Sequence, residues 1–349
     1  MEVRPHKTII FAALEACEKL KRNWAKPVLR AVLEKSLREG LQSKQSPASS
    51  NRLPDWLYEE ITSTYSEQQQ KQILKAWDTD QENIALRPNK PDFTEEMLIQ
   101  SLNKTGIPWK KHPWSSALLI EKKRICEIPG LENHDCYIQD PTHQYLTTTL
   151  PNLPNHSVVL DACGAPGGKT GALLQRQPQL RIDVVDKNAL KQEITRENLQ
   201  HYHPNVSILS EDSTTLHLKK ESIDYTAILL DAPCSATANI GQNPEIKINQ
   251  TPESITHLNQ QQAKLLHATW QSLKPGGYLL YSTCSLLKAE NSEQISHFLS
   301  SHSNAVSLPL TSPQSGEKSA HGVVILPDNY TRGGFFALLQ KVLEKTVDK

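Results

Sequence analysis

The order of apolar and polar residues changes near residue 150. Beyond this point, short apolar runs alternate with amphipathic stretches. The apolar runs predict strands at 157–163, 181–186, 206–209, 225–231 and 277–283. The stretches between them predict helices at 170–176, 189–201 and 257–273. Strands and helices that alternate in this way form a parallel sheet covered on both faces, because each crossover is right-handed.

The residues after 283 predict the last elements of this α/β half. A helix is predicted at 290–300, and the apolar runs 323–326 and 335–342 predict an antiparallel pair at the sheet edge. Leu266 and Trp270 lie on the helix before the last parallel strand, and we expect both in the core. The fold class is therefore α/β, a Rossmann-like, doubly wound and mostly parallel sheet with a smaller N-terminal α/β segment.

The first 150 residues carry helical periodicity. Between 8 and 40 the apolar spacing predicts two helices, with Pro27 in the first turn of the second and Gly40 at its end. Two helices cannot bury a core alone, so they dock elsewhere or belong to a truncated helical domain. Further helices are predicted at 57–65, 67–77 and 93–103, the last with Thr94 as its N-cap.

These patterns divide the chain into four parts. We expect a helical segment at 1–45 and a linker at 46–53, within the polar, Ser-rich residues 41–53. A connecting subdomain at 54–148 and the α/β domain at 149–345 follow.

Composition excludes some partners and compartments. The 349 residues contain 38 basic and 38 acidic side chains, so net charge indicates no general attraction to nucleic acid. Mean hydropathy is −0.51, and no apolar run reaches the roughly 18 residues that span a bilayer, so no membrane association is expected. Six scattered cysteines form neither a disulfide framework nor a metal-ligand spacing. We expect a reducing cytoplasm, free thiols and no metal site.

One basic stretch in the connecting subdomain has two interpretations. Residues 104–124 contain six basic side chains and one acid, Glu121, with Trp109 and Trp114 between them. Basic groups bind phosphates and tryptophans stack on bases, which favours an RNA-facing surface. A solvated basic loop with half-buried tryptophans explains the pattern equally well.

A glycine-rich corner follows the first predicted strand, with the sequence DACGAPGGKT at 161–170. Glycines here allow the backbone to approach a ligand, and the following helix N-terminus favours negative charge. A P-loop is excluded because Cys163 stands where its first glycine is required, and GxGxxG is absent. A purely structural turn remains the alternative.

Carboxylates follow the next two strands. Asp186 is placed to accept hydrogen bonds from both hydroxyls of a ribose, and Asp212 could meet an adenine amino group. Each acid alone is a weak signal, since acids often end strands. Together with the glycine corner they describe an adenosine pocket without a phosphate clamp, which S-adenosylmethionine fits.

Two cysteines stand at the ends of the fourth and fifth strands. Cys234 lies in DAPCS and Cys284 in STCS. Free cysteines are usually core residues, but a thiolate beside a methyl donor can attack C6 of cytosine and make C5 nucleophilic. A second thiol is useful when the adduct is released. Methyltransferases that act on exocyclic amines usually carry [DN]PP[YF] at the fourth strand, where this chain has Cys234.

The segments LDACGAPGGKT, LLDAPCSAT and YSTCSLLKAEN resemble the motifs of the RNA 5-methylcytosine methyltransferase family. The resemblance continues through LPDWL, LRPN, IPG, IQD and GFFALL and covers roughly residues 10–345. It implies a class I S-adenosylmethionine-dependent methyltransferase that acts on C5 of cytosine in structured RNA. The implied target is 16S rRNA. Transfer RNA is an alternative, and so is an RNA-binding remnant without turnover.

The resemblance also implies roles for individual residues. Cys284 would be the C6 nucleophile, Cys234 would assist product release, and Asp231 would hold the cytosine ring. The residues implied to hold S-adenosylmethionine are Cys163, Gly164, Ala165, Pro166, Gly167, Gly168, Lys169, Asp186, Asp212 and Asp231.

Two regions depart from the family pattern. The family implies an N-terminal NusB-like helical domain that binds RNA, and residues 1–45 resemble only its last two helices, as a remnant would. The connecting subdomain 54–148 would then bind RNA in a monomeric enzyme. After DAPCSAT the usual basic pair is replaced by ANIGQNPE at 238–245, which puts RNA affinity or target choice in question.

Overall fold

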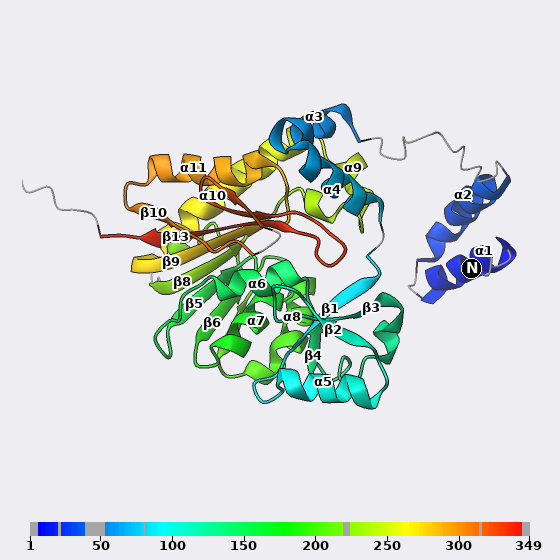
Figure 1. Ribbon diagram of the computed structural model, residues 1–349, viewed down its shortest axis with the longest axis horizontal. Coiled ribbons are helices and arrows are strands. Elements are labelled where there is room, and N and C mark those ends of the chain that lie inside the picture. The colour runs from blue at the N-terminus through cyan, green and yellow to red at the C-terminus, as the bar shows by residue number, and fades with distance from the viewer. Residues whose placement is uncertain are drawn as a thin grey trace, which may run out of the picture. The chain divides into compact units, whose positions relative to one another are not determined.

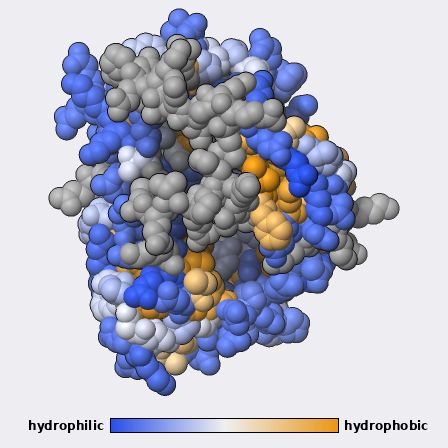
Figure 2. Space-filling view, turned by 90° about the vertical axis from the view of Figure 1, so that its right-hand side faces the viewer, coloured by the Kyte–Doolittle hydropathy of each residue, from blue (hydrophilic) through white to orange (hydrophobic). Residues whose placement is uncertain are grey.

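The computed structural model describes residues 6–19, 22–38, 53–79, 81–218, 224–313 and 316–343. The chain forms two compact units, Met1–Arg52 and Leu53–Lys349, each described here by itself. Among the described residues, no helix combines the length and apolar character needed to cross a bilayer. On the face drawn in Figure 2, hydrophilic side chains predominate and apolar side chains gather in smaller patches.

The first unit contains the two predicted helices, α1 (His6–Lys19) and α2 (Lys26–Arg38), joined through the short 3-10 helix η1 (Asn23–Ala25). Lys26 forms an ion pair with Glu18 at 3.0 Å, which links the two helices. Pro27 lies in the first turn of α2, as predicted. The expected helix end at Gly40 and the linker 46–53 up to Arg52 lie outside the described residues.

The second unit begins with helices and a small antiparallel sheet. Helices α3 (Asp55–Thr64) and α4 (Glu67–Asp78) precede four strands in the order β2-β3-β1-β4. The strands are β1 (Asn83–Pro88), β2 (Trp109–Lys111), β3 (Leu118–Glu121) and β4 (Cys136–Ile138). Helix α5 (Glu95–Lys104) packs on this sheet. Its N-cap is Thr94, which accepts a hydrogen bond from the Met97 backbone and confirms that prediction.

The large sheet has nine strands. Eight of them follow the order β11-β12-β13-β9-β8-β5-β6-β7, and β10 pairs with β13. The bounds are β5 (Val158–Ala162), β6 (Arg181–Val185), β7 (Val206–Leu209), β8 (Tyr225–Asp231), β9 (Leu273–Thr283), β10 (Ala305–Leu308), β11 (Gly316–Ser319), β12 (Gly322–Ile325) and β13 (Gly334–Lys341). Neighbours from β7 through β9 are parallel, and β13 is antiparallel to both β9 and β12. The predicted parallel strands and the antiparallel pair are therefore confirmed.

Helices cover both faces of the large sheet, as a doubly wound fold requires (Figure 1). Alternate residues of the central strands face opposite ways, so Leu160 packs with α10 and α11 whereas Val159 packs with α6, α7 and α8. The bounds are α6 (Pro141–Thr148), α7 (Gly168–Arg176), α8 (Ala189–Leu199), α9 (Ile246–Asn249), α10 (Pro252–Gln271) and α11 (Ser292–Ser301). Leu266 and Trp270 on α10 are buried in the core, which confirms the expectation for both.

Two elements differ from their predicted extent. Helix α10 begins at Pro252, five residues before the predicted start, because Thr251 and Ser254 form a capping box there. Strand β9 begins at Leu273 and not at 277. Gly276 has φ +78° within it, a conformation that glycine adopts without steric cost.

Candidate active site

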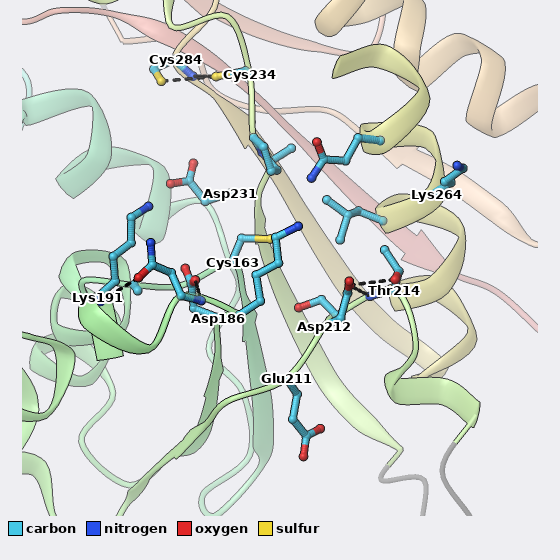
Figure 3. Close-up of a pocket in the computed structure, with 18 residues that line it drawn as sticks. Cys163, Asp186, Lys191, Glu211, Asp212, Thr214, Asp231, Cys234, Lys264 and Cys284 are labelled. Carbon is cyan, nitrogen blue, oxygen red and sulfur yellow. Dashed lines mark hydrogen bonds between the residues drawn. The ribbon is translucent and has the colours of Figure 1, made fainter. Parts of the chain in front are cut away.

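A pocket of about 690 Å³ lies at the carboxyl ends of the parallel strands (Figure 3). Strand β5 pairs with β6 on one side and β8 on the other, so the chain reverses its direction of winding here. Open α/β sheets bind ligands at such switch points. The sequence-predicted residues that line the pocket are Cys163, Ala165, Asp186, Asp212, Asp231, Cys234 and Cys284.

The other predicted cofactor residues shape the turn behind the pocket wall. Gly167 has φ +90° and is the N-cap of α7, and a Cβ there would approach Leu199 to 2.8 Å. A Cβ on Gly164 would lie 2.5 Å from the carboxyl carbon of Asp161. These glycines let the backbone fold tightly from β5 into α7. Pro166 belongs to the same turn, Gly168 and Lys169 are the first residues of α7, and none of the three lines the pocket.

Asp161 supports this turn from inside the protein. Its Oδ2 accepts a hydrogen bond from Thr170 Oγ1 at 2.5 Å, whereas its buried Oδ1 has no partner among the described residues. Burial raises the pKa of Asp161 to about 6, against the opposing effects of Thr170 and Lys169.

Two carboxylates are fixed at the far end of the pocket from the cysteines (Figure 3). Asp186 Oδ1 accepts a hydrogen bond from the Asn188 backbone at 2.8 Å. Asp212 Oδ1 accepts from the Thr214 backbone at 2.9 Å and from its hydroxyl at 2.7 Å. These two hydrogen bonds lower the pKa of Asp212, so its carboxylate is ionised at neutral pH. The two acids can therefore accept hydrogen bonds from a ligand's hydroxyl and amino groups.

The two thiols meet where β8 and β9 end. Asp231 pairs with Ser282 across these parallel strands, and the cysteines follow shortly after. Cys234 Sγ lies 3.3 Å from Cys284 Sγ and also accepts a hydrogen bond from the Cys284 backbone at 3.3 Å. The hydrogen bond from Cys234 lowers the pKa of the Cys284 thiol, and the same contact and burial raise that of Cys234. The proton therefore stays on Cys234 while Cys284 is the more readily ionised thiol.

An ion pair lies between the thiols and the carboxylates. Lys169 Nζ is 2.5 Å from Asp231 Oδ2, and Ser282 donates to Asp231 Oδ1 at 2.9 Å. Burial disfavours both charges, but their mutual attraction outweighs it and raises the pKa of Lys169 while lowering that of Asp231. His143 faces the same pair, and burial lowers its pKa to about 4, so it is neutral at pH 7.

Several residues around the pocket were not singled out from the sequence. Lys191 on α8 and Lys264 on α10 line its walls. Arg87 of β1 donates to the Gly168 carbonyl at 3.0 Å and so fixes the start of α7. The LRPN and IQD segments gave a signal for Arg87 and its partner Gln139, because both segments belong to the resemblance. Glu290 lies beneath the two cysteine loops, and the sequence contained no signal for it beyond its place in YSTCSLLKAEN.

The loop 238–245 and the basic stretch 104–124 are the two regions that the sequence associates with RNA. The loop 238–245 packs against α4, where a Cβ on Gly241 would lie 2.6 Å from the Ala76 carbonyl oxygen, so position 241 has no room for a side chain. In the basic stretch, Trp114 is half-buried and contacts His112 and Tyr145 edge-on, and Trp109 donates to Asn103 at 2.8 Å. Both tryptophans thus have protein contacts, and the choice between the two interpretations of this stretch stays open.

The switch-point pocket, with its glycine turn and paired carboxylates, places the protein in the class I S-adenosylmethionine-dependent methyltransferases. Within that class the resemblance found in the sequence is confirmed. Residues 148–340 match the profile described as 16S rRNA methyltransferase RsmB/F, and the chain belongs to this family. It is an RNA cytosine-C5 methyltransferase that uses S-adenosylmethionine.

Similar proteins span most of the chain. A probable ribosomal RNA small subunit methyltransferase B from Coxiella burnetii is 32% identical and covers 95% of this chain and 79% of its own. A methyltransferase homologue from Pyrococcus horikoshii is 27% identical with a TM-score of 0.68, covering 82% of this chain and 93% of its own. NSun6 from the same organism, solved with SFG, shares the fold at 19% identity and a TM-score of 0.71, over 83% of this chain and 99% of its own.

Proposed function

We propose that this protein methylates C5 of a cytosine in 16S rRNA through a covalent bond between Cys284 Sγ and C6. The observation that carries the proposal is the 3.3 Å contact between the Cys234 and Cys284 thiols in the same pocket as Asp186 and Asp212. The name of the Coxiella burnetii relative, a small-subunit rRNA methyltransferase, supports 16S rRNA as the target.

The cofactor fits the far end of the pocket. The carboxylates of Asp186 and Asp212 are placed to accept hydrogen bonds from ribose hydroxyls and an adenine amino group. The turn at 163–169 leaves room for the methionine part, because Gly164 and Gly167 bring the backbone close without side chains. When bound, S-adenosylmethionine supplies the methyl group. SFG, with which the NSun6 structure was solved, is an analogue of this cofactor.

The thiol pair accounts for the covalent chemistry. The Cys284 thiolate forms a bond to C6, and C5 gains the methyl group. C5 then gives its proton to solvent water, the C5–C6 double bond re-forms, and the bond from Cys284 to C6 breaks with its electron pair returning to the sulfur as thiolate. The Cys234 thiol donates its hydrogen bond to the Cys284 sulfur, which stabilises the thiolate before attack and again as the leaving group. Cys234 therefore assists product release as well as formation of the thiolate.

Asp231 holds the cytosine ring beside the two sulfurs. Its carboxylate lines the pocket and is kept ionised by Lys169, so it can accept a hydrogen bond from the amino group of the base. A cytosine must leave its stack to reach this depth, which favours a loop or junction in the RNA. Lys110 and Lys111 are exposed on the connecting subdomain 54–148, where we place RNA contacts. We assign the helices of residues 1–45 to RNA as well and propose a monomer that works in the cytoplasm.

Methyl transfer from labelled S-adenosylmethionine tests the proposal. Unmodified small-subunit rRNA and bulk tRNA are each incubated with wild type, Cys284→Ala and Cys126→Ala, the last an exposed cysteine as control. We expect label in 5-methylcytosine of the rRNA with wild type and Cys126→Ala only. Transfer to tRNA alone would show that tRNA and not rRNA is the substrate. Full activity of Cys284→Ala would overturn the covalent mechanism. Binding of RNA without any transfer would identify a non-catalytic remnant.

A further inference from the structure

A buried carboxylate lies directly beneath the two cysteine loops. Glu290 is 0% exposed and ends the short helix η6 (Lys288–Glu290) that precedes α11. No Lys or Arg forms an ion pair with it in the part of the chain that the structure describes. A buried charge is costly unless it is fully hydrogen-bonded, so the position of Glu290 requires a reason.

Glu290 binds the residue that follows each cysteine. Its Oε1 accepts from the Ser235 backbone at 2.8 Å, and its Oε2 accepts from the Ser235 hydroxyl at 2.5 Å. The same Oε2 accepts from the Ser285 hydroxyl at 2.5 Å. Ser235 follows Cys234 and Ser285 follows Cys284, so one carboxylate joins both loops at the positions next to their sulfurs.

Two neighbours extend this junction. Gln262 on α10 donates through Nε2 to Glu290 Oε1 at 3.0 Å and to the Pro233 carbonyl at 2.9 Å. Asn291 donates to the Ser285 carbonyl at 2.9 Å. The DAPCS loop is therefore fixed on both sides of Cys234, and the TCS loop is fixed immediately after Cys284.

We propose that Glu290 is a positioning residue that holds the Cys234 and Cys284 thiols within hydrogen-bond distance of each other. The negative charge of Glu290 raises the pKa of both thiols, so the difference between them comes from the hydrogen bond that Cys234 donates to Cys284. This inference rests on the proposed roles of the two cysteines. It concerns a residue that contacts neither RNA nor cofactor in that proposal.

Two substitutions separate the contacts of Glu290 from its charge. Glu290→Ala removes every contact, so the loops can move apart and Cys284 loses the hydrogen bond that lowers its pKa. Glu290→Gln can keep the junction, because its oxygen can accept from Ser235 and Gln262 while its amide donates to the two hydroxyls. Glu293→Gln, an exposed acid on α11, is the matched control.

The experiment measures the pH dependence of Cys284 alkylation by iodoacetamide, with the modified peptide identified by mass spectrometry, together with kcat for methyl transfer. For Glu290→Ala we expect the alkylation midpoint to move to higher pH and kcat to fall about 100-fold, the loss that a misplacement of about 1 Å causes. Affinity for S-adenosylmethionine should change less than about twofold. Glu290→Gln and Glu293→Gln should keep the wild-type midpoint within about 0.3 pH units and kcat within about tenfold.

A purely structural role would lower the melting temperature and leave the midpoint and kcat of the folded enzyme unchanged, which would overturn the inference. If Glu290→Ala does not fold, Ser285→Ala removes the contact between Glu290 and the TCS loop and should move the midpoint in the same direction. Alkylation needs no RNA. Failure of methyl transfer by the wild type would therefore refute the proposed function while the role of Glu290 is still tested.

Discussion

Arg87 is the buried contact between the small antiparallel sheet and the glycine turn of the pocket. Its guanidinium donates to Gln139 Oε1 at 2.6 Å, Asn89 Oδ1 at 2.8 Å, the Pro88 carbonyl at 2.8 Å and the Gly168 carbonyl at 3.0 Å. It also lies 4.8 Å above the ring of Tyr137. We predict that Arg87→Met, which keeps most of the side-chain volume, destabilises the protein and weakens cofactor binding.

The magnitude follows from two opposing effects. Four hydrogen bonds from a charged group contribute about 6 kcal/mol at the low end of the usual range. The cost of burying the charged guanidinium opposes this contribution. Burial lowers the pKa of Arg87 from 12.5 to about 10, which at 1.36 kcal/mol per unit corresponds to a cost of about 3 kcal/mol. Arg87→Met removes both the hydrogen bonds and the cost of burying the charge, so the free energy of unfolding should fall by the difference, about 3 kcal/mol. This is a large part of the roughly 5–15 kcal/mol that stabilises a typical domain.

Urea unfolding and calorimetric titration with S-adenosylmethionine measure the two effects. The control is Arg196→Met on α8, because Arg196 is exposed and pairs with Glu193 at 3.0 Å. We expect the control to change stability by less than about 0.5 kcal/mol. Arg87→Met should also weaken cofactor affinity about tenfold, because Gly168 loses its donor at the start of α7. A stability change no larger than that of the control would refute the reasoning.

Three further predictions concern the same turn. Because the pKa of Asp161 is about 6 when folded and 3.8 otherwise, the folded protein retains a proton that the unfolded chain loses, and stability falls as pH rises from about 4 to 6. Asp161→Asn should remove this fall, which is worth about 3 kcal/mol, in urea titrations at pH 4 and pH 8; an unchanged pH dependence would contradict it. Lys169→Met leaves the Asp231 carboxylate without its ion-pair partner and should cost about 3 kcal/mol of stability at pH 7. The loss should be smaller at pH 3, where the carboxylate of the variant is protonated, and equal losses at both pH values would argue against the ion pair. Gly167→Ala should cost about 2 kcal/mol by thermal unfolding, more than Gly106→Ala, since both need positive φ but only Gly167 faces a close neighbour; equal costs would show that packing is irrelevant there.

The large sheet could be predicted from the sequence because its central strands are buried on both faces. Strand β8 is a continuous apolar run whose residues are nearly all buried, and such runs are easily recognised. The small antiparallel sheet gives a weaker pattern. Strand β2 has three residues, of which Lys110 and Lys111 are exposed, so nothing in that segment indicates a strand by alternation.

The residues at the strand ends were predictable for the same reason, since the chemistry follows directly where each apolar run stops. The contacts that hold these residues in place were not. Glu290 lies in a polar segment, LKAEN, that by itself is typical of a surface turn. It is buried because the DAPCS loop, 55 residues earlier in the chain, packs over it beside the neighbouring TCS loop. Arg87 lies inside an apolar strand, and its acceptors Gln139 and Gly168 are 52 and 81 residues away. Such contacts depend on tertiary packing, which local periodicity does not encode.

The covalent intermediate tests the central claim most directly. Cys234→Ala is incubated with unmodified small-subunit rRNA and S-adenosylmethionine, denatured, and examined by gel electrophoresis and mass spectrometry beside the double variant Cys234→Ala/Cys284→Ala. We predict that Cys234→Ala retains RNA on a peptide that contains Cys284, because release is slowed, and that the double variant retains none. An RNA adduct of the same yield in the double variant would contradict the assignment of Cys284 as the nucleophile.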